Sequence, residues 1–151
     1  MKNKTFLIII MLFVFIITGC NLKSQKSNER SNLINNSNEV INYMKIIINN
    51  KEYKINLENN NTVKEFINLL PLELNMNELN GNEKYAYLDN NLTTNSYNIK
   101  HINAGDVMLY GNNCLVIFYK SFDTSYSYTK IGHIDNLEDL GNKNINVKLE
   151  K

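Results

Sequence analysis

The amino-acid sequence predicts a mainly β fold, a closed barrel of about eight short strands with one short helix. Apolar runs rich in β-branched and aromatic residues recur along the chain, separated by Gly and Asn connectors. Only the segment 62–70 has apolar residues at clear helical spacing. So many short strands in an open sheet would leave two edges with unpaired backbone groups, and closure into a barrel removes both edges.

The first 19 residues are predicted to be an export signal. Lys2 and Lys4 precede an apolar run, 6–17, and the segment closes with Ile17-Thr18-Gly19-Cys20. A charged start, an apolar middle and small residues before a cleavage site are typical of a secretory signal peptide. The last four residues resemble the lipobox of bacterial lipoproteins, whose cysteine is acylated and becomes the mature N terminus. The alternative is an uncleaved transmembrane helix. Such a helix needs roughly 20 apolar residues, and the run 6–17 is shorter.

The lipobox resemblance implies a lipid on Cys20 and a protein anchored in the cell membrane, facing the extracytoplasmic side. Residues 20–42 are dominated by Asn, Ser, Lys and Glu, so they are expected to form a flexible tether. Residues 43–151 are long enough for one hydrophobic core and too short for two. We therefore expect a signal peptide (1–19), a lipidated tether (20–42) and a β-barrel domain (43–151).

Charge and cysteine content narrow the classes of function. The chain has 16 basic and 15 acidic residues, and removal of residues 1–19 takes away two lysines, which leaves 14 against 15 and a net charge of −1. No basic surface is therefore expected to bind nucleic acid. With Cys20 lipidated, Cys114 has no partner for an intramolecular disulfide, and its apolar neighbours favour a buried small hydrophobe.

The barrel domain is predicted to begin with a hairpin. Residues 44–49 form an apolar run, Asn50-Lys51 forms the turn, and Tyr53, Ile55 and Leu57 alternate with polar residues. This alternation indicates one buried face and one exposed face.

The single helix is predicted to follow over residues 62–70. Thr62 and Glu65 have the spacing of a capping box, and Pro71 ends the helix because the residue before a proline is disfavoured in helical conformation. The apolar residues share one side of this helix: Val63, Phe66, Ile67 and Leu70. Because two turns are marginal in isolation, this side must pack on the sheet.

The middle of the domain is predicted to hold four strands. Two of them, 72–76 and 83–88, are joined through an Asn80-Gly81 turn, and the polar residues 93–102 are expected to form a loop. A central hairpin follows over 104–120, where Gly111-Asn112-Asn113 connects two apolar runs. Neither run alternates cleanly, so both faces of this hairpin should be covered, by the barrel interior and by a helix or loop.

The C-terminal part begins with a segment rich in Ser, Thr and Tyr, 121–129, followed by a strand at 130–134. A helical turn is predicted at 137–140 and ends at Gly141. In the last strand, Ile145, Val147 and Leu149 alternate with polar residues.

The order of these elements resembles a family of small bacterial proteins with a cyclophilin-like fold, a closed β-barrel with few helices. The resemblance spans about Met44 to Leu149 and implies the fold, but no established reaction. It is carried by Leu70-Pro71-Leu72, Leu79-Asn80-Gly81-Asn82-Glu83-Lys84-Tyr85, Asn103-Ala104-Gly105-Asp106-Val107-Met108-Leu109-Tyr110 and Thr124-Ser125-Tyr126-Ser127-Tyr128-Thr129-Lys130-Ile131-Gly132-His133-Ile134.

The residues of prolyl isomerases are not found. True cyclophilins use an arginine that hydrogen-bonds the proline nitrogen, beside a Phe-Met-x-Gln run that lines the proline pocket. The single arginine, Arg30, and the single glutamine, Gln25, both lie in the predicted tether, and the Phe-Met-x-Gln run is missing. We therefore expect no prolyl isomerase activity.

An enzyme of another kind stays open as the alternative. His101 and His133 are the side chains that titrate near neutral pH, so a degenerate isomerase or a hydrolase would use one of them. A dyad of histidine with Cys114 is disfavoured because no neighbouring residue lowers the thiol pKa. Asp135, Glu138 and Asp139 fit a solvated helical turn better than a calcium loop, so neither a metal nor a cofactor is expected.

Tyrosine is the residue type that suggests a binding function. Tyrosine offers a large contact area and a polar tip at low entropic cost, but it also fills strand positions in any barrel. Side chains two apart on a strand share a face, so Tyr85 with Tyr87, and Tyr126 with Tyr128, form two pairs. The hypothesis is that these four residues build a groove on the barrel wall for a small molecule or a peptide.

Overall fold

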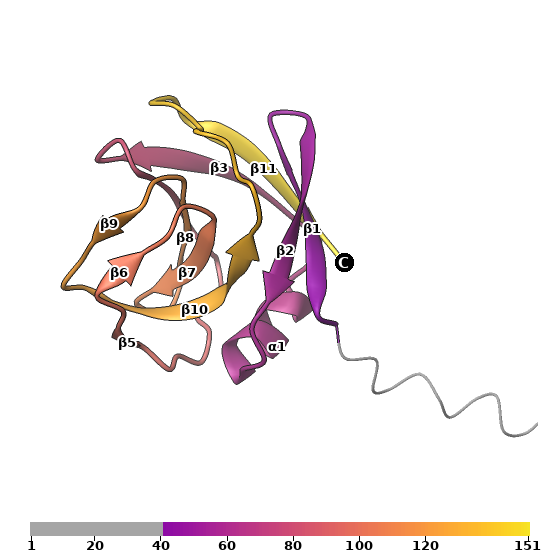
Figure 1. Ribbon diagram of the computed structural model, residues 1–151. Helices are drawn as coiled ribbons and strands as arrows, with labels where there is room; N and C mark the ends of the chain where they lie inside the picture. The colour runs from indigo at the N-terminus through magenta and orange to yellow at the C-terminus, as the bar shows by residue number, and fades with distance from the viewer. Residues whose placement is uncertain (1–40) are drawn as a thin grey trace, which may run out of the picture. The chain divides into compact units, whose positions relative to one another are not determined.

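The computed structural model describes residues 41–151, which form eleven strands and one helix (Figure 1). The predictions for the signal peptide (1–19), for lipidation of Cys20 and for residues 20–40 of the tether lie outside the described residues. The elements are β1 (Tyr43–Ile48), β2 (Lys51–Leu57), α1 (Asn61–Asn68), β3 (Leu72–Leu79), β4 (Glu83–Tyr87), β5 (Tyr97–Asn98), β6 (His101–Ile102), β7 (Asp106–Tyr110), β8 (Cys114–Phe118), β9 (Phe122–Asp123), β10 (Ser127–Ile134) and β11 (Ile145–Glu150).

Eight antiparallel strands close into a barrel, so the predicted fold class is confirmed. Their order is β2-β1-β11-β3-β4-β8-β7-β10, and β10 pairs with β2 to complete the circle. Gly132 lies opposite Leu57 at this closure, and a Cβ on Gly132 would come within 2.3 Å of the carbonyl oxygen of Asn56. The β10–β2 pairing that closes the barrel therefore requires glycine at this position.

Both predicted hairpins are present. β1 and β2 are joined by Asn49 and Asn50, with φ values of 48° and 66°, one residue earlier than expected. β7 and β8 pair with Tyr110 opposite Cys114, and Gly111 has φ 62°. Asn and Gly tolerate these left-handed conformations, so the connectors specify the tight turns.

Helix α1 forms as predicted, but its predicted capping box is wrong. The N-cap is Asn60, whose side chain accepts a hydrogen bond from the Val63 amide at 2.9 Å. Thr62 instead donates to the carbonyl of Thr93 at 2.6 Å, and Glu65 accepts from the amide and the hydroxyl of Thr93, both at 2.7 Å. Both capping-box residues therefore hold the loop after β4, a long-range partner that local spacing does not reveal.

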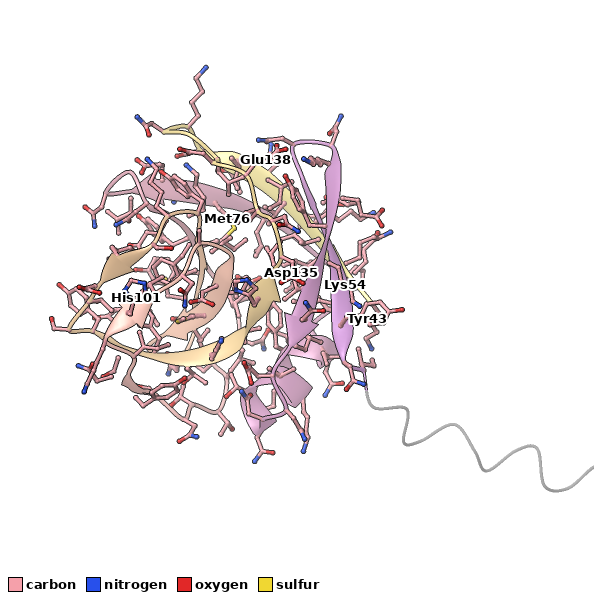
Figure 2. All side chains as sticks on the ribbon, in the orientation of Figure 1. Tyr43, Lys54, Met76, His101, Asp135 and Glu138 are labelled. Carbon is pink, nitrogen blue, oxygen red and sulfur yellow. The ribbon has the colours of Figure 1, made fainter. Side chains whose placement is uncertain are left out.

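The helical turn predicted at 137–140 is also wrong, because these residues have no regular secondary structure. Side chains take the backbone groups that a helical turn would use: Asp139 accepts from the amide of Gly141 at 2.8 Å, and Lys84 donates to the carbonyl of Gly141. Glu138, labelled in Figure 2, forms an ion pair with Lys51 of β2. Such side-chain bonds compete with helix formation.

The apolar residues form two layers. The barrel interior holds the larger cluster, which includes Met76, Val107 and Ile117 and is extended by Phe66 of α1. The second cluster lies on the outer face of the β7–β8 hairpin and consists of Ile102, Met108, Cys114, Val116, Phe118 and Tyr128. Both faces of the central hairpin are therefore covered, as predicted.

The cover of the outer face comes from short strands within the segments 93–102 and 121–129. β5 pairs with β10, and β6 pairs with β9 (Figure 1). Ile99 and Phe122 pack against the second cluster. The loop prediction for 93–102 is therefore only partly correct, since residues with weak strand patterns pair over two positions.

Candidate functional site

A cavity of about 310 Å³ opens on the outer face of β4, β8, β7 and β10, and we call it the tyrosine pocket. Five tyrosines and one carboxylate dominate its lining. The lining residues are Leu79, Asn80, Glu83, Tyr85, Tyr87, Tyr110, Cys114, Val116, Tyr126 and Tyr128.

Strand alternation and pairing explain how these residues meet. Glu83, Tyr85 and Tyr87 occupy alternate positions of β4, so all three face outward. On β8, Val116 lies opposite Tyr85, and Cys114 lies opposite Tyr87. β8 therefore forms the floor of the pocket, and tyrosines rise from the strands on either side of it.

The tyrosine rings contact one another in two groups. Tyr85 and Tyr87 have ring centroids 6.0 Å apart and planes at 82°. Tyr110 contacts Tyr126 at 6.1 Å and 87°, and Tyr128 at 5.6 Å and 52°. Edge-to-face and tilted pairs suit the ring quadrupole. None of these three neighbouring pairs is a parallel stack.

The rings differ in burial. Tyr87 and Tyr126 are 66% and 61% exposed, whereas Tyr128 is 6% exposed and belongs to the second apolar cluster. Burial, followed by the charge of Glu83, raises the pKa of Tyr128 to about 12. Tyr128 therefore anchors the pocket in the core, and Tyr87 and Tyr126 are exposed residues at its rim.

Two further groups in the lining are titratable. Burial raises the pKa of Glu83 above its ordinary value, and the nearby charge of Glu78 adds to this effect. Burial also raises the pKa of Cys114, with a smaller contribution from Glu83. A thiol with a raised pKa is a poor nucleophile, so Cys114 acts here as an apolar floor residue.

All four tyrosines named from the sequence, Tyr85, Tyr87, Tyr126 and Tyr128, line this one pocket. Sequence reasoning missed Tyr110, Glu83 and Asn80. Glu83 shares the alternation of Tyr85 and Tyr87, so this signal was present in β4. Tyr110 gave no such signal, because its run is apolar on both faces and does not show which residues point outward.

The histidines lie elsewhere and apart from Cys114. His101 on β6 pairs with Asp123 at 2.6 Å in an exposed position (Figure 2). His133 pairs through Nδ1 with the buried Asp106 at 3.0 Å. Neither histidine lines the tyrosine pocket. The structure therefore brings each histidine to an aspartate, not to a thiol or hydroxyl nucleophile.

Within residues 41–151, no group of three or more His, Cys, Asp or Glu side chains is placed to hold a metal ion. In the same part of the chain, no helix has the length and apolar character needed to cross a membrane.

Comparison with known proteins gives one match. The sequence model of a family described as the cyclophilin-like family matches residues 46–150. No curated protein and no solved structure matches the chain.

Proposed function

The chain belongs to the cyclophilin-like family, and we propose that its barrel is a ligand-binding module without prolyl isomerase activity. The ligand is a small molecule or a short peptide, and the site is the tyrosine pocket. We propose further that residues 1–19 export the protein and that a lipid on Cys20 anchors it to the outer side of the cell membrane.

One observation carries the binding proposal: large aromatic side chains are held exposed around a cavity. Tyr87 and Tyr126 stay 66% and 61% exposed although an apolar cluster lies directly beneath them. Tyrosine is enriched among the residues that contribute most to binding, and aromatic side chains predominate in the lining of ligand pockets. An eight-stranded barrel is filled by its own side chains, so a ligand must meet its outer wall or its loops.

A screen of small molecules and short peptides by ligand-observed NMR tests this proposal. The double variant Tyr87→Ala/Tyr126→Ala should lose at least about tenfold in affinity for any hit, because rim rings supply contact area. Tyr43→Ala is the matched control, since Tyr43 is 57% exposed on β1, under Lys54 and away from the pocket (Figure 2). Hits that bind the double variant as tightly as the wild type would contradict the proposal.

Anchoring is tested by the change Cys20→Ala. We expect the variant to be released into the soluble fraction or to stay unprocessed, whereas the wild type is recovered with membranes. The intact mass of the mature wild-type protein should include the acyl chains. A mature protein without lipid on Cys20 would exclude this mode of anchoring.

An enzyme is the second candidate, and the His133–Asp106 pair is the observation that favours it. A buried aspartate bonded to Nδ1 orients an imidazole as catalytic bases are oriented. An isomerisation assay on a proline peptide distinguishes the enzyme from the binding module. The uncatalysed reaction takes tens of seconds at 25 °C. Acceleration that His133→Gln abolishes would favour the enzyme and overturn the proposed absence of isomerase activity.

A further inference from the structure

The Glu83 carboxylate has no partner within the part of the chain that the structure describes. It is half-buried in the lining of the tyrosine pocket, and no hydrogen bond or ion pair among residues 41–151 uses it. Partial burial of a carboxylate without a compensating group disfavours its ionised form. A cation in the pocket would favour the ionised form of Glu83.

The pocket has no cation of its own. Neither lysine nor arginine occurs in its lining. Lys84 is next to Glu83 in sequence, but it points into the barrel, where its ammonium donates to the carbonyls of Gly141 and Lys143 at 2.5 and 2.9 Å. Alternation along β4 thus separates the two charges onto opposite faces of the wall. The outer face keeps the negative charge unpaired.

The five tyrosines add to this negative potential. The face of an aromatic ring attracts a cation, and several rings around a carboxylate favour an ammonium group over a neutral group of the same shape. A methylated ammonium cannot donate N–H hydrogen bonds, so it needs ring faces and one charge rather than a set of acceptors. The pocket offers this combination, because five tyrosines and the single carboxylate of Glu83 line it.

We propose that the tyrosine pocket binds a small organic cation with a methylated ammonium group, held by the rings of Tyr85, Tyr87, Tyr110 and Tyr126 and by the carboxylate of Glu83. This inference rests on the proposed binding function of the pocket and names its ligand class. The volume of about 310 Å³ accepts a complete small molecule of this kind.

The test compares choline with its neutral carbon isostere, 3,3-dimethylbutan-1-ol, by calorimetry on the full chain. Choline should bind at least about tenfold more tightly than the isostere. Glu83→Gln should lower choline affinity about tenfold or more and leave binding of the isostere unchanged. Glu73→Gln, at an exposed glutamate outside this pocket, is the matched control and should have no effect.

A pH series gives a second measurement that needs no variant. Choline affinity should fall on acidification, beginning above the pH at which an ordinary glutamate is protonated, because the pKa of Glu83 is raised. The titratable groups around Glu83 come from every element of the pocket wall. They are Glu78 on β3, Tyr85 and Tyr87 on β4, Tyr110 on β7, Cys114 on β8, Tyr119 after β8, Tyr126 before β10 and Tyr128 on β10. Of these, only Glu78 is a carboxyl group.

The outcomes separate this inference from the proposed function. Equal binding of choline and isostere, both lost in Tyr87→Ala/Tyr126→Ala, would overturn the cation and keep the pocket as a binding site. Failure of choline to bind when a neutral hit from the screen does bind would have the same meaning. A peptide that carries trimethyllysine is the last ligand tested. If it binds more tightly than choline, the natural ligand is a methylated peptide, and the proposal of a small molecule is overturned.

Discussion

Two stretches of the outer barrel surface differ although the same strand geometry builds both. The tyrosine wall, on β4, β8, β7 and β10, carries the second apolar cluster and the tyrosine pocket. The polar wall, on β1, β11 and β3, carries charged and amide side chains. There Glu150 pairs with Lys45 at 2.6 Å and with Lys148 at 2.7 Å, and Asn75 donates to Asn146 at 2.8 Å.

Each wall has a hollow, and the larger one is the weaker candidate for a site. The hollow of the polar wall measures about 480 Å³, but among its lining residues the amides of Asn75 and Asn146 bond to each other and Lys148 pairs with Glu150. The hollow of the tyrosine wall is smaller and keeps Glu83 unpaired within residues 41–151. Glu73 in the polar hollow also has no hydrogen bond or ion pair within residues 41–151, but it is exposed to water, whereas Glu83 is half-buried. Burial of an unpaired carboxylate therefore distinguishes the two walls better than volume does.

The largest expected effect comes from removing the apolar cover of the tyrosine wall. Phe118 is fully buried on the outer face. Its ring centroid lies 5.7 Å from that of Phe122 and 5.5 Å from that of Tyr128. Phe118→Ala should lower the free energy of unfolding by about 3–5 kcal/mol, as measured by urea denaturation. Asn146→Ala, at an exposed position of the polar wall, should change it by about 0.5 kcal/mol or less. Similar losses for both variants would show that the two walls do not differ in packing.

The second largest effect distinguishes the buried Tyr128 of the tyrosine pocket from Tyr126 at its rim. Tyr128→Ala should lower the free energy of unfolding by about 3 kcal/mol, because its ring is only 6% exposed and packs in the second cluster. Tyr126→Ala should cost less than about 1 kcal/mol, because its ring is 61% exposed. Thermal and urea unfolding of both variants measure this difference. A large loss for Tyr126→Ala would assign its ring to the core and remove the rim from the proposed site.

A smaller effect is expected in alkali. The pKa values of Tyr119 and Tyr128 are raised to about 12, mainly by burial, whereas an unfolded tyrosine titrates near 10. The folded state therefore holds more protons between these values, and the free energy of unfolding should fall as pH rises from about 10 to about 12. Tyr128→Phe should flatten this decline, whereas Tyr126→Phe should not. An unchanged slope in Tyr128→Phe would contradict the assignment.

The smallest effect is expected on the polar wall in acid. Hydrogen bonds from Lys148 and then Lys45 lower the pKa of Glu150 to about 2, so its contribution is present above its ordinary value of 4.5 and is lost as pH falls toward 2. Glu150→Gln should make the melting temperature slightly less sensitive to pH across this range. Exposed ion pairs contribute little to the free energy of unfolding and are screened by salt. A loss of stability in Glu150→Gln comparable to that of Phe118→Ala would contradict this ranking.

Errors in the predicted elements have one physical cause. Thr62 and Glu65 fit a capping box by spacing, but Thr93 offers both side chains a partner that only the folded chain brings near. Residues 137–140 fit a helical turn, but Lys84, more than fifty positions earlier, takes the carbonyl of Gly141. Local patterns fail where a distant group competes for the same hydrogen bonds.

The sequence by itself determined the strands of the barrel, the hairpin connectors and the shared face of Tyr85 and Tyr87, because side chains alternate along a strand and Asn and Gly accept left-handed turns. Only the tertiary structure decided that β4 and β10 lie on either side of the β8–β7 hairpin, which brings their tyrosines and Tyr110 around one cavity. It also turned Lys84 inward and left Glu83 outward and unpaired within residues 41–151. Such pairings depend on barrel closure between segments far apart in the chain, for which no local pattern exists.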